Sequence, residues 1–176
     1  MSRGLGDVYK RQTADALGPR TVQRILVTMG AGAAPPVRGL RPVAAVAPGV
    51  AAATGLSLQQ LAAALVGQLR PAAVVCVDSL CSAEGQRLGR TVQFSDTGLY
   101  PAQADHTRHL TRDTLGVPVV AAGIPTLMQA QEGADLVVTP RALDSVIAHG
   151  AALLAGSVNR ALQPRLTVQQ LCWLTG

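Results

Sequence analysis

Apolar residues along the chain follow two alternating patterns, one typical of helices and one typical of buried strands. Leu58, Leu61 and Leu65 recur at the spacing of one helix face, whereas residues 72–77 (AAVVCV) form a continuous, β-branched run. The two patterns predict helices over residues 15–29, 58–69, 126–131 and 140–162. They predict strands over residues 42–47, 72–77, 91–94, 117–122 and 136–138. Because strands and helices alternate, the pattern predicts an α/β fold with a mostly parallel sheet.

The composition favours closely packed layers. Hydrophobic residues make up 48% of the 176 residues and aromatic residues only 2%, so small Ala, Val and Leu side chains must fill the core. We therefore expect a three-layer α/β/α sandwich, formed by one domain over residues 13–176. Residues 1–12 (MSRGLGDVYKRQ) hold the only lysine and differ in composition from the rest. We expect this segment to be unrelated to the domain or artefactual.

Charge and cysteine content narrow the possible partners. The formal net charge is +5, but no aromatic side chains interleave with the arginines as they do in single-strand nucleic-acid binders. We therefore expect no direct nucleic-acid partner. The three cysteines lack the spacing of metal ligands, and no uninterrupted apolar run is long enough to span a membrane. These features predict a cytoplasmic protein without a membrane partner, and the cysteines indicate no metal site.

Two aspartates are the strongest candidates for chemistry. Asp78 directly follows the apolar run 72–77, and α/β proteins bind ligands beyond the carboxyl ends of their parallel strands. Asp15 lies at the start of the first predicted helix and is expected where a preceding strand ends. Two such carboxylates can share a proton, so that one acts as an acid and the other as a base toward water. From the residues alone, Asp15 also fits a helix N-cap and Asp78 a polar loop position.

Other residues suggest different sites. Asp96, Thr97 and Gly98 spell the D-T-G of pepsin-like proteases, but those enzymes are all-β. We instead expect a polar turn that lines the cleft and binds substrate, formed by Ser95, Asp96, Thr97 and Gly98. His106 and His109 beside Asp105 suggest a metal, although two such ligands do not close a site. Ser79 has no histidine partner visible in the sequence, which argues against a serine nucleophile.

Several sequence blocks follow one another between residues 13 and 165. They are TADALGP (13–19), RPVAAVAPGV (41–50) with Thr54-Gly55, VDSL (77–80), TVQFSDTGLYP (91–101), TLGVPVVAAGIPT (114–126), VVTP (137–140) and GSVNRAL (156–162). The ordered set resembles the germination (spore) protease family, whose members are atypical aspartic endopeptidases. By motif, the family's catalytic aspartates fall on Asp15 and Asp78.

The resemblance implies a function as well as a fold. Members of the family cleave small acid-soluble spore proteins during germination, in the spore core, and are made as zymogens. Their fold is similar to that of hydrogenase maturation proteases, so a phosphorylase/hydrolase-like sandwich is implied. A homo-oligomer is also implied, without metal or organic cofactor. The strand expected before Asp15 is missing from this sequence, so the chain looks truncated.

Two alternative functions remain open at this point. The first is a hydrogenase-maturation-type endopeptidase, in which a nickel on the partner directs cleavage. The second is a catalytically inactive, protease-like remnant that acts as a binding protein.

Overall fold

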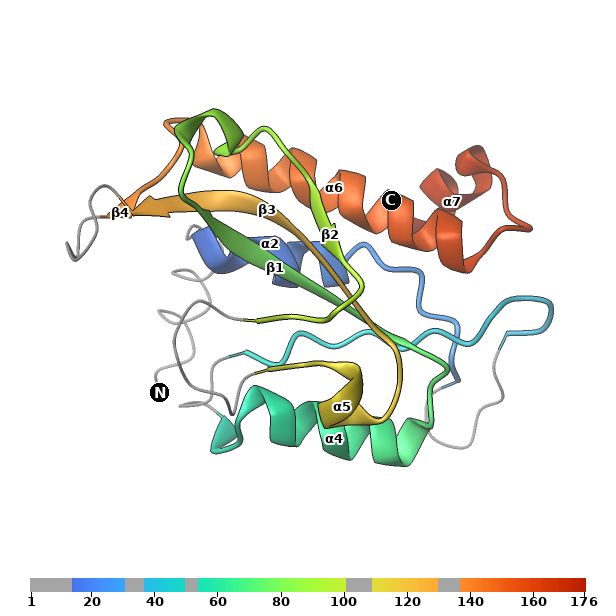
Figure 1. The fold of residues 1–176 in the computed structure, drawn as a ribbon. Coiled ribbons are helices and arrows are strands. Elements are labelled where there is room, and N and C mark those ends of the chain that lie inside the picture. Colours follow the sequence, from blue (N-terminus) through green and yellow to red (C-terminus); the bar gives the residue numbers. More distant parts are fainter. Residues whose placement is uncertain (1–13, 31–36, 50–53, 101–108, 130–136) are drawn as a thin grey trace, which may run out of the picture. The chain divides into compact units, whose positions relative to one another are not determined.

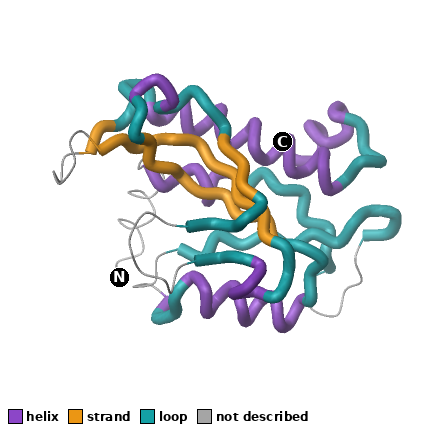
Figure 2. Tube along the Cα trace, in the orientation of Figure 1, coloured by secondary structure: helices purple, strands orange, loops and turns teal. Residues whose placement is uncertain are grey.

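The computed structural model describes residues 14–30, 37–49, 54–100, 109–129 and 137–176 (Figures 1 and 2). The chain divides into two compact units, and each is described by itself. The first comprises Met1–Ala47 with Asp144–Gly176, and the second comprises Pro48–Leu143. The segment 1–12, and His106 with Asp105 from the candidate metal motif, lie outside the described residues.

A small mixed sheet forms the centre of the second unit. Its strands are β1 (Val74–Ser82), β2 (Gln93–Ser95), β3 (Val119–Gln129) and β4 (Val137–Val138). β3 lies between β1, which is parallel to it, and β2, which is antiparallel, while β4 pairs antiparallel with the end of β3 (Figure 1). The α/β class is therefore confirmed. The three-layer sandwich with a mostly parallel sheet is not confirmed. Only one of the three strand pairings in the described part is parallel, and the other two are antiparallel.

Two helices complete the core of the second unit. α4 (Leu58–Leu69) matches its predicted bounds and begins with a capping box. In that box Gln60 N–H donates to Ser57 Oγ, and Ser57 N–H donates to Gln60 Oε1. The short helix α5 (Arg112–Leu115) begins with a second box on Thr111. The buried cluster comprises Cys76, Leu99, Leu110, Leu115, Val119 and Ala121, with Leu58, Ala62 and Val66 of α4 packed against it.

The first unit is helical. A 3-10 turn η1 (Ala14–Ala16) leads into α2 (Leu17–Val22), and the chain returns as α6 (Leu143–Leu162) and α7 (Val168–Thr175). Two buried side-chain amides, Asn159 on α6 and Gln163 just after it, form hydrogen bonds with the segments that follow α2. Asn159 accepts from Leu26 N–H at 2.9 Å and donates to Arg24 C=O at 2.8 Å. Gln163 makes the same pair of bonds with the backbone of Arg41.

Hydrogen bonds of these segments explain two errors in the sequence-based prediction. The helix predicted over residues 15–29 ends at Val22, because Leu26 N–H bonds to Asn159 instead of continuing the helical ladder. The strand predicted over residues 42–47 is not a strand. Val43 C=O accepts from the N–H groups of Thr28 and Met29, and Val43 N–H donates to the Thr28 hydroxyl. Two backbone N–H groups and one side-chain hydroxyl thus satisfy the groups of Val43 that a sheet would otherwise pair.

The prediction was also wrong about where the long strands end. The predicted strand 72–77 extends through Ser82, and the predicted strand 117–122 runs on to Gln129. Residues 126–129 therefore belong to β3 and not to the predicted helix 126–131. The pairing shifts register between Leu80 and Cys81, which lets β1 and β3 stay paired past Pro125 although proline offers no N–H.

Candidate active site

Asp78 lies in the middle of β1. We predicted that it would lie directly after the end of this strand, and that prediction was wrong. Its Cα is level with Gly123 on β3 in the parallel ladder. The side chain is half-buried, and its Oδ1 accepts a hydrogen bond from Ser79 N–H at 2.8 Å. Because every second residue of a strand projects to the same face of the sheet, Asp78 shares a face with Cys76, two positions earlier. Residues of α4 and α5 pack against the sheet on this face.

The thiol of Cys76 reports on the environment beside Asp78. Burial of the thiol, and then the negative charge of Asp78, raise the pKa of Cys76 from 9.0 to about 11. The carboxylate of Asp78 is therefore close enough to a poorly solvated group to influence its ionisation. A charge held beside a buried apolar cluster acts more strongly on its neighbours than one surrounded by water.

Gly123 is a supporting residue that our reading of the sequence missed. A Cβ at this position would lie 2.5 Å from Asp78 O and 2.6 Å from Leu80 Cγ. The backbone of β3 therefore approaches Asp78 more closely than any residue with a side chain allows. A glycine inside an otherwise apolar strand is the sequence signal for such an approach. The predicted strand 117–122 stops one residue before Gly123, so this signal falls outside it.

The predicted substrate-binding turn follows β2. Ser95 Oγ lies 2.8 Å from Thr97 Oγ1 and accepts from Thr97 N–H, while Asp96 is exposed. Gly98 has a φ of +110°, and a Cβ there would collide with the carbonyl oxygen of Leu110. Only glycine allows the turn to close against the segment that precedes α5.

The structure does not bring this turn next to Asp78. Gln93 is the β2 residue level with Gly123 and Asp78, whereas Ser95 is level with Ala121. Two strand spacings separate β1 from β2, which is roughly 10 Å. Because β2 is antiparallel, the chain after Ser95 runs toward the amino ends of β1 and β3, away from Asp78. Asp78 and the turn therefore share the sheet but lie apart on it.

Asp15 lies in η1, in the first unit. Its side chain is exposed, and the buried Ala16 and Leu17 follow it directly. Inside α2, the buried Thr21 hydroxyl donates to Leu17 C=O at 2.8 Å. Asp15 is thus not the N-cap of α2, a position that Ala16 occupies without a side-chain hydrogen bond. Since Asp78 belongs to the second unit, the pairing of the two aspartates stays a prediction.

The other polar candidates have structural surroundings of their own. The His109 ring lies against the Tyr100 ring with centroids 5.0 Å apart, and the exposed His149 lies 3.2 Å from the hydroxyl of Ser145. Among the residues that the structure describes, no group of three or more His, Cys, Asp or Glu side chains could hold a metal ion. In the same part of the chain, no helix is both long and apolar enough to cross a membrane.

Comparison with known proteins identifies the family. A family model described as germination protease matches residues 2–132. The germination protease of Halalkalibacterium halodurans is 39% identical over 142 residues, which cover 78% of this chain and 37% of the relative. The chain belongs to the germination protease family.

Further germination proteases extend the comparison. That of Bacillus subtilis is 39% identical over 123 residues, which cover 67% of this chain and 33% of the relative. That of Clostridium perfringens strain 13 is 29% identical over 210 residues, which cover 90% of this chain and 65% of the relative. The chain thus spans between a third and two thirds of the length of these curated germination proteases. The matched region 2–132 includes Asp15, Asp78 and the turn at Ser95.

Proposed function

We propose that this chain provides the catalytic part of an aspartic-type endopeptidase, which hydrolyses small acid-soluble spore proteins during germination. The observation that carries the proposal is membership of the germination protease family, together with a half-buried Asp78 held on β1, which pairs with the central strand β3. Cytoplasmic location in the spore core, synthesis as a zymogen and homo-oligomerisation belong to the same proposal. They rest on the family and not on a feature of the described residues.

The proposed mechanism uses Asp15 and Asp78 as a pair that shares one proton. The ionised carboxylate accepts a proton from a water molecule while the water oxygen forms a bond to the carbon of the scissile peptide. The protonated carboxylate donates a hydrogen bond to the peptide oxygen, where negative charge develops. The carbon–nitrogen bond then breaks as a proton passes from the pair to the leaving amine. Positioned proton transfer of this kind contributes about 10²–10⁴-fold to a rate.

The rigidity of β1 supports a catalytic role for Asp78. Its backbone is fixed on one side by the ladder to β3, and Gly123 allows that ladder to lie unusually close. A catalytic carboxylate on a paired strand is held more precisely than one on a loop. The negative charge of Asp78 already acts on a neighbouring buried thiol, which supports an environment where charge is only partly screened.

Ser95, Asp96, Thr97 and Gly98 have a proposed role in substrate binding. Because the turn lies away from Asp78 on the sheet, it would contact the substrate several residues from the scissile bond. The exposed Asp96 and Thr97 offer polar groups for such contacts, and Gly98 keeps the turn closed.

Cleavage of purified acid-soluble spore proteins tests the proposed function. The wild-type chain is compared with Asp78→Asn and Asp15→Asn. Asp113→Asn and Asp144→Asn serve as controls, because each removes an exposed carboxylate from the same unit as one candidate. We expect cleavage by the wild type and both controls, and none by the two candidate variants. Cleavage that survives both Asp78→Asn and Asp15→Asn would refute the proposal. Binding without cleavage by the wild type would favour a protease-like binding protein.

A further inference from the structure

In the described part of the chain, β1 forms one edge of the sheet (Figure 1). Val74 N–H donates to Pro118 C=O, next to β3, at 2.9 Å, which sets the direction of the backbone groups along β1. Because these groups alternate in direction along a strand, those of Cys76 also bond to β3. The N–H and C=O groups of Val75 and Val77 point to the outer edge instead. Among the described residues no strand pairs with that edge, and Val75 is 40% exposed.

The outer edge of β1 lacks the features that usually prevent an edge strand from pairing with another chain. Such strands are short, or they carry charged residues, proline or a bulge. β2, on the other side of β3, is three residues long (Gln93–Ser95), whereas β1 extends over nine residues (Val74–Ser82). β1 begins with the uncharged run VVCV, and its register shift comes only after Leu80. β1 therefore offers a pairing surface that β2 does not offer.

The candidate catalytic carboxylate lies at the same edge. Ser79 N–H, directly after Asp78, points to the outer edge like the N–H of Val77. Asp78 Oδ1 accepts a hydrogen bond from this N–H at 2.8 Å, so one carboxylate oxygen reaches the edge of the sheet. A strand added to β1 would lie about 4.8 Å from it. The backbone of such a strand would therefore pass within reach of the carboxylate.

A row of N–H and C=O groups at strand spacing is complementary to the backbone of an extended polypeptide. We propose that the substrate binds as an added strand on the outer edge of β1, through the backbone groups of Val75 and Val77, with its scissile bond beside Asp78. That the bound polypeptide is cleaved rests on the proposed peptidase function. A polypeptide is also the occupant that the family favours, since its members are proteases by name. Beyond Val75, the bound chain would continue toward the amino end of β1, as the chain after Ser95 does.

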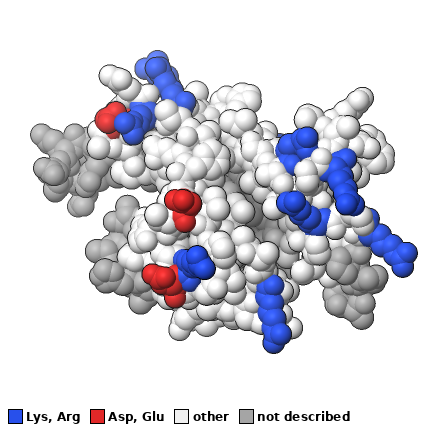
Figure 3. Space-filling model, turned by 45° about the vertical axis from the view of Figure 1, so that its right-hand side comes forward, with Lys and Arg blue, Asp and Glu red and all other residues white. Residues whose placement is uncertain are grey.

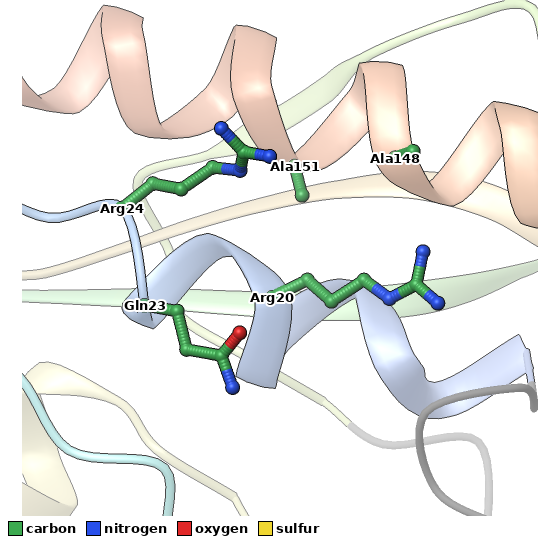
Figure 4. A pocket seen from close by; sticks show the side chains of 5 residues that line it. All are labelled: Arg20, Gln23, Arg24, Ala148 and Ala151. Carbon is green, nitrogen blue, oxygen red and sulfur yellow. The ribbon is translucent and has the colours of Figure 1, made fainter. Parts of the chain in front are cut away.

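Two further features of the described surface are less suited to an extended polypeptide. On the face drawn in Figure 3, arginine side chains are divided among several places, with uncharged areas between them. The first unit has a cavity of about 210 Å³ between α2 and α6 (Figure 4). Its lining residues are Arg20, Gln23, Arg24, Ala148 and Ala151. This space is smaller than the roughly 300–1,000 Å³ of usual ligand pockets, so it offers a polypeptide less contact than a strand edge does.

Amide hydrogen exchange, followed by NMR, tests the binding mode residue by residue. Asp78→Asn is used, because its Oδ1 can still accept from Ser79 N–H, and a purified acid-soluble spore protein is the probe. In the free protein, the amides of Val75 and Val77 should exchange rapidly and that of Cys76, bonded to β3, slowly. The probe should slow exchange at Val75 and Val77 by about tenfold or more and leave Cys76 unchanged. Unchanged exchange at both valines, whether or not the probe binds, would overturn the proposal.

Val75→Pro is an independent test, since it removes an outward N–H without removing a bond to β3. The matched control is Phe94→Pro on β2. Phe94 is level with Ala122, whose backbone groups bond to β1, so the N–H of Phe94 also points away from β3. We expect Val75→Pro to weaken binding of the fluorescently labelled spore protein about tenfold, measured by anisotropy, and Phe94→Pro to weaken it less than about twofold. Equal weakening by the two variants would overturn the proposal.

Failure of the edge and failure of the peptidase function give different results. Protection of Val75 and Val77 without cleavage by the wild type would refute the peptidase function and retain the strand-binding edge. Cleavage by the wild type, without protection of these amides, would do the reverse. Protection that appears on raising the protein concentration alone, together with dimers in analytical ultracentrifugation, would overturn the substrate assignment in favour of a second copy of this chain.

Discussion

Gly123 lies opposite Asp78 in the ladder between β1 and β3, so close that a Cβ would come within 2.5 Å of Asp78 O. The candidate catalytic carboxylate therefore depends on a residue without a side chain on the neighbouring strand. We expect Gly123→Ala to lower the free energy of unfolding by about 1–3 kcal/mol, as overpacking of a filled core does. Urea denaturation measures the change. Cleavage should fall as well, because the strand that carries Asp78 must shift.

The matched control for that substitution is Gly67→Ala in α4. A Cβ at Gly67 meets no atom within 4 Å, and alanine favours a helix by up to about 1 kcal/mol over glycine. Gly67→Ala should leave stability unchanged or raise it. An equal loss of stability in both variants would show that the approach of β3 to Asp78 is not the cause.

The three thiols should react at very different rates. Cys81 and Cys172 are exposed, whereas Cys76 is buried with a pKa raised to about 11, by burial and then by Asp78. At pH 8, only on the order of 0.1% of Cys76 would be thiolate, the form that reacts. We expect maleimide, followed by mass spectrometry, to modify two cysteines rapidly and Cys76 slowly. Asp78→Asn should speed up the labelling of Cys76, since it removes a nearby negative charge. Rapid labelling of all three cysteines in the wild type would contradict the buried environment of Cys76.

The same thiol makes stability depend on alkaline pH. Its folded-state pKa of about 11 exceeds the ordinary value of 9.0, so the unfolded chain releases the proton first as pH rises. The stabilisation is therefore complete below about pH 9 and is lost as pH rises toward 11. The rise of about two pKa units corresponds to a stabilisation on the order of 3 kcal/mol. Urea denaturation between pH 8 and 11 should show a shallower decline for Cys76→Ala than for the wild type. Parallel declines in the two proteins would contradict the raised pKa.

Asn159 is the main polar contact that fixes the segment after α2. The side-chain amide of Asn159 accepts a hydrogen bond from Leu26 N–H and donates one to Arg24 C=O. Removal of a buried partner costs about 1–3 kcal/mol for each group left unpaired. We expect Asn159→Ala to destabilise the protein by about 2–4 kcal/mol in chemical denaturation. Gln169→Ala, exposed on α7, should change stability by less than about 0.5 kcal/mol. A similarly small effect of Asn159→Ala would show that these bonds do not stabilise the first unit.

Local sequence patterns predicted the elements whose stability is local. α4 was correct at both ends, because a regular apolar face and a Ser57 capping box define it within a dozen residues. The α/β class and the existence of β1, β2, β3 and β4 were also predictable from apolar runs. The end of α2 and the irregular backbone around Val43 were not. The end of α2 depends on the Asn159 amide, more than a hundred residues away in the chain, and Val43 depends on bonds to Thr28 and Met29.

The candidate site, too, was predictable where it depends on local sequence and not where it depends on distant strands. Asp78 was recognised from its apolar strand and from the family motif, but its place inside β1 depends on pairing with β3 past Pro125. The antiparallel direction of β2, which separates the turn at Ser95 from Asp78, was not visible in a three-residue strand. A single sequence does not reveal strand direction, because an apolar run reads the same in a parallel and an antiparallel ladder.

The central claim is that Asp15 and Asp78 act as one catalytic pair. A double-mutant cycle on kcat for cleavage of acid-soluble spore proteins tests it most directly, with Asp15→Asn, Asp78→Asn and the double variant compared. Each single variant should lose about a hundredfold or more, and the double variant should be no slower than the slower single one, as for residues that act as a unit. Losses that multiply in the double variant, or cleavage that persists in either single variant at the wild-type rate, would contradict a shared role for the two aspartates.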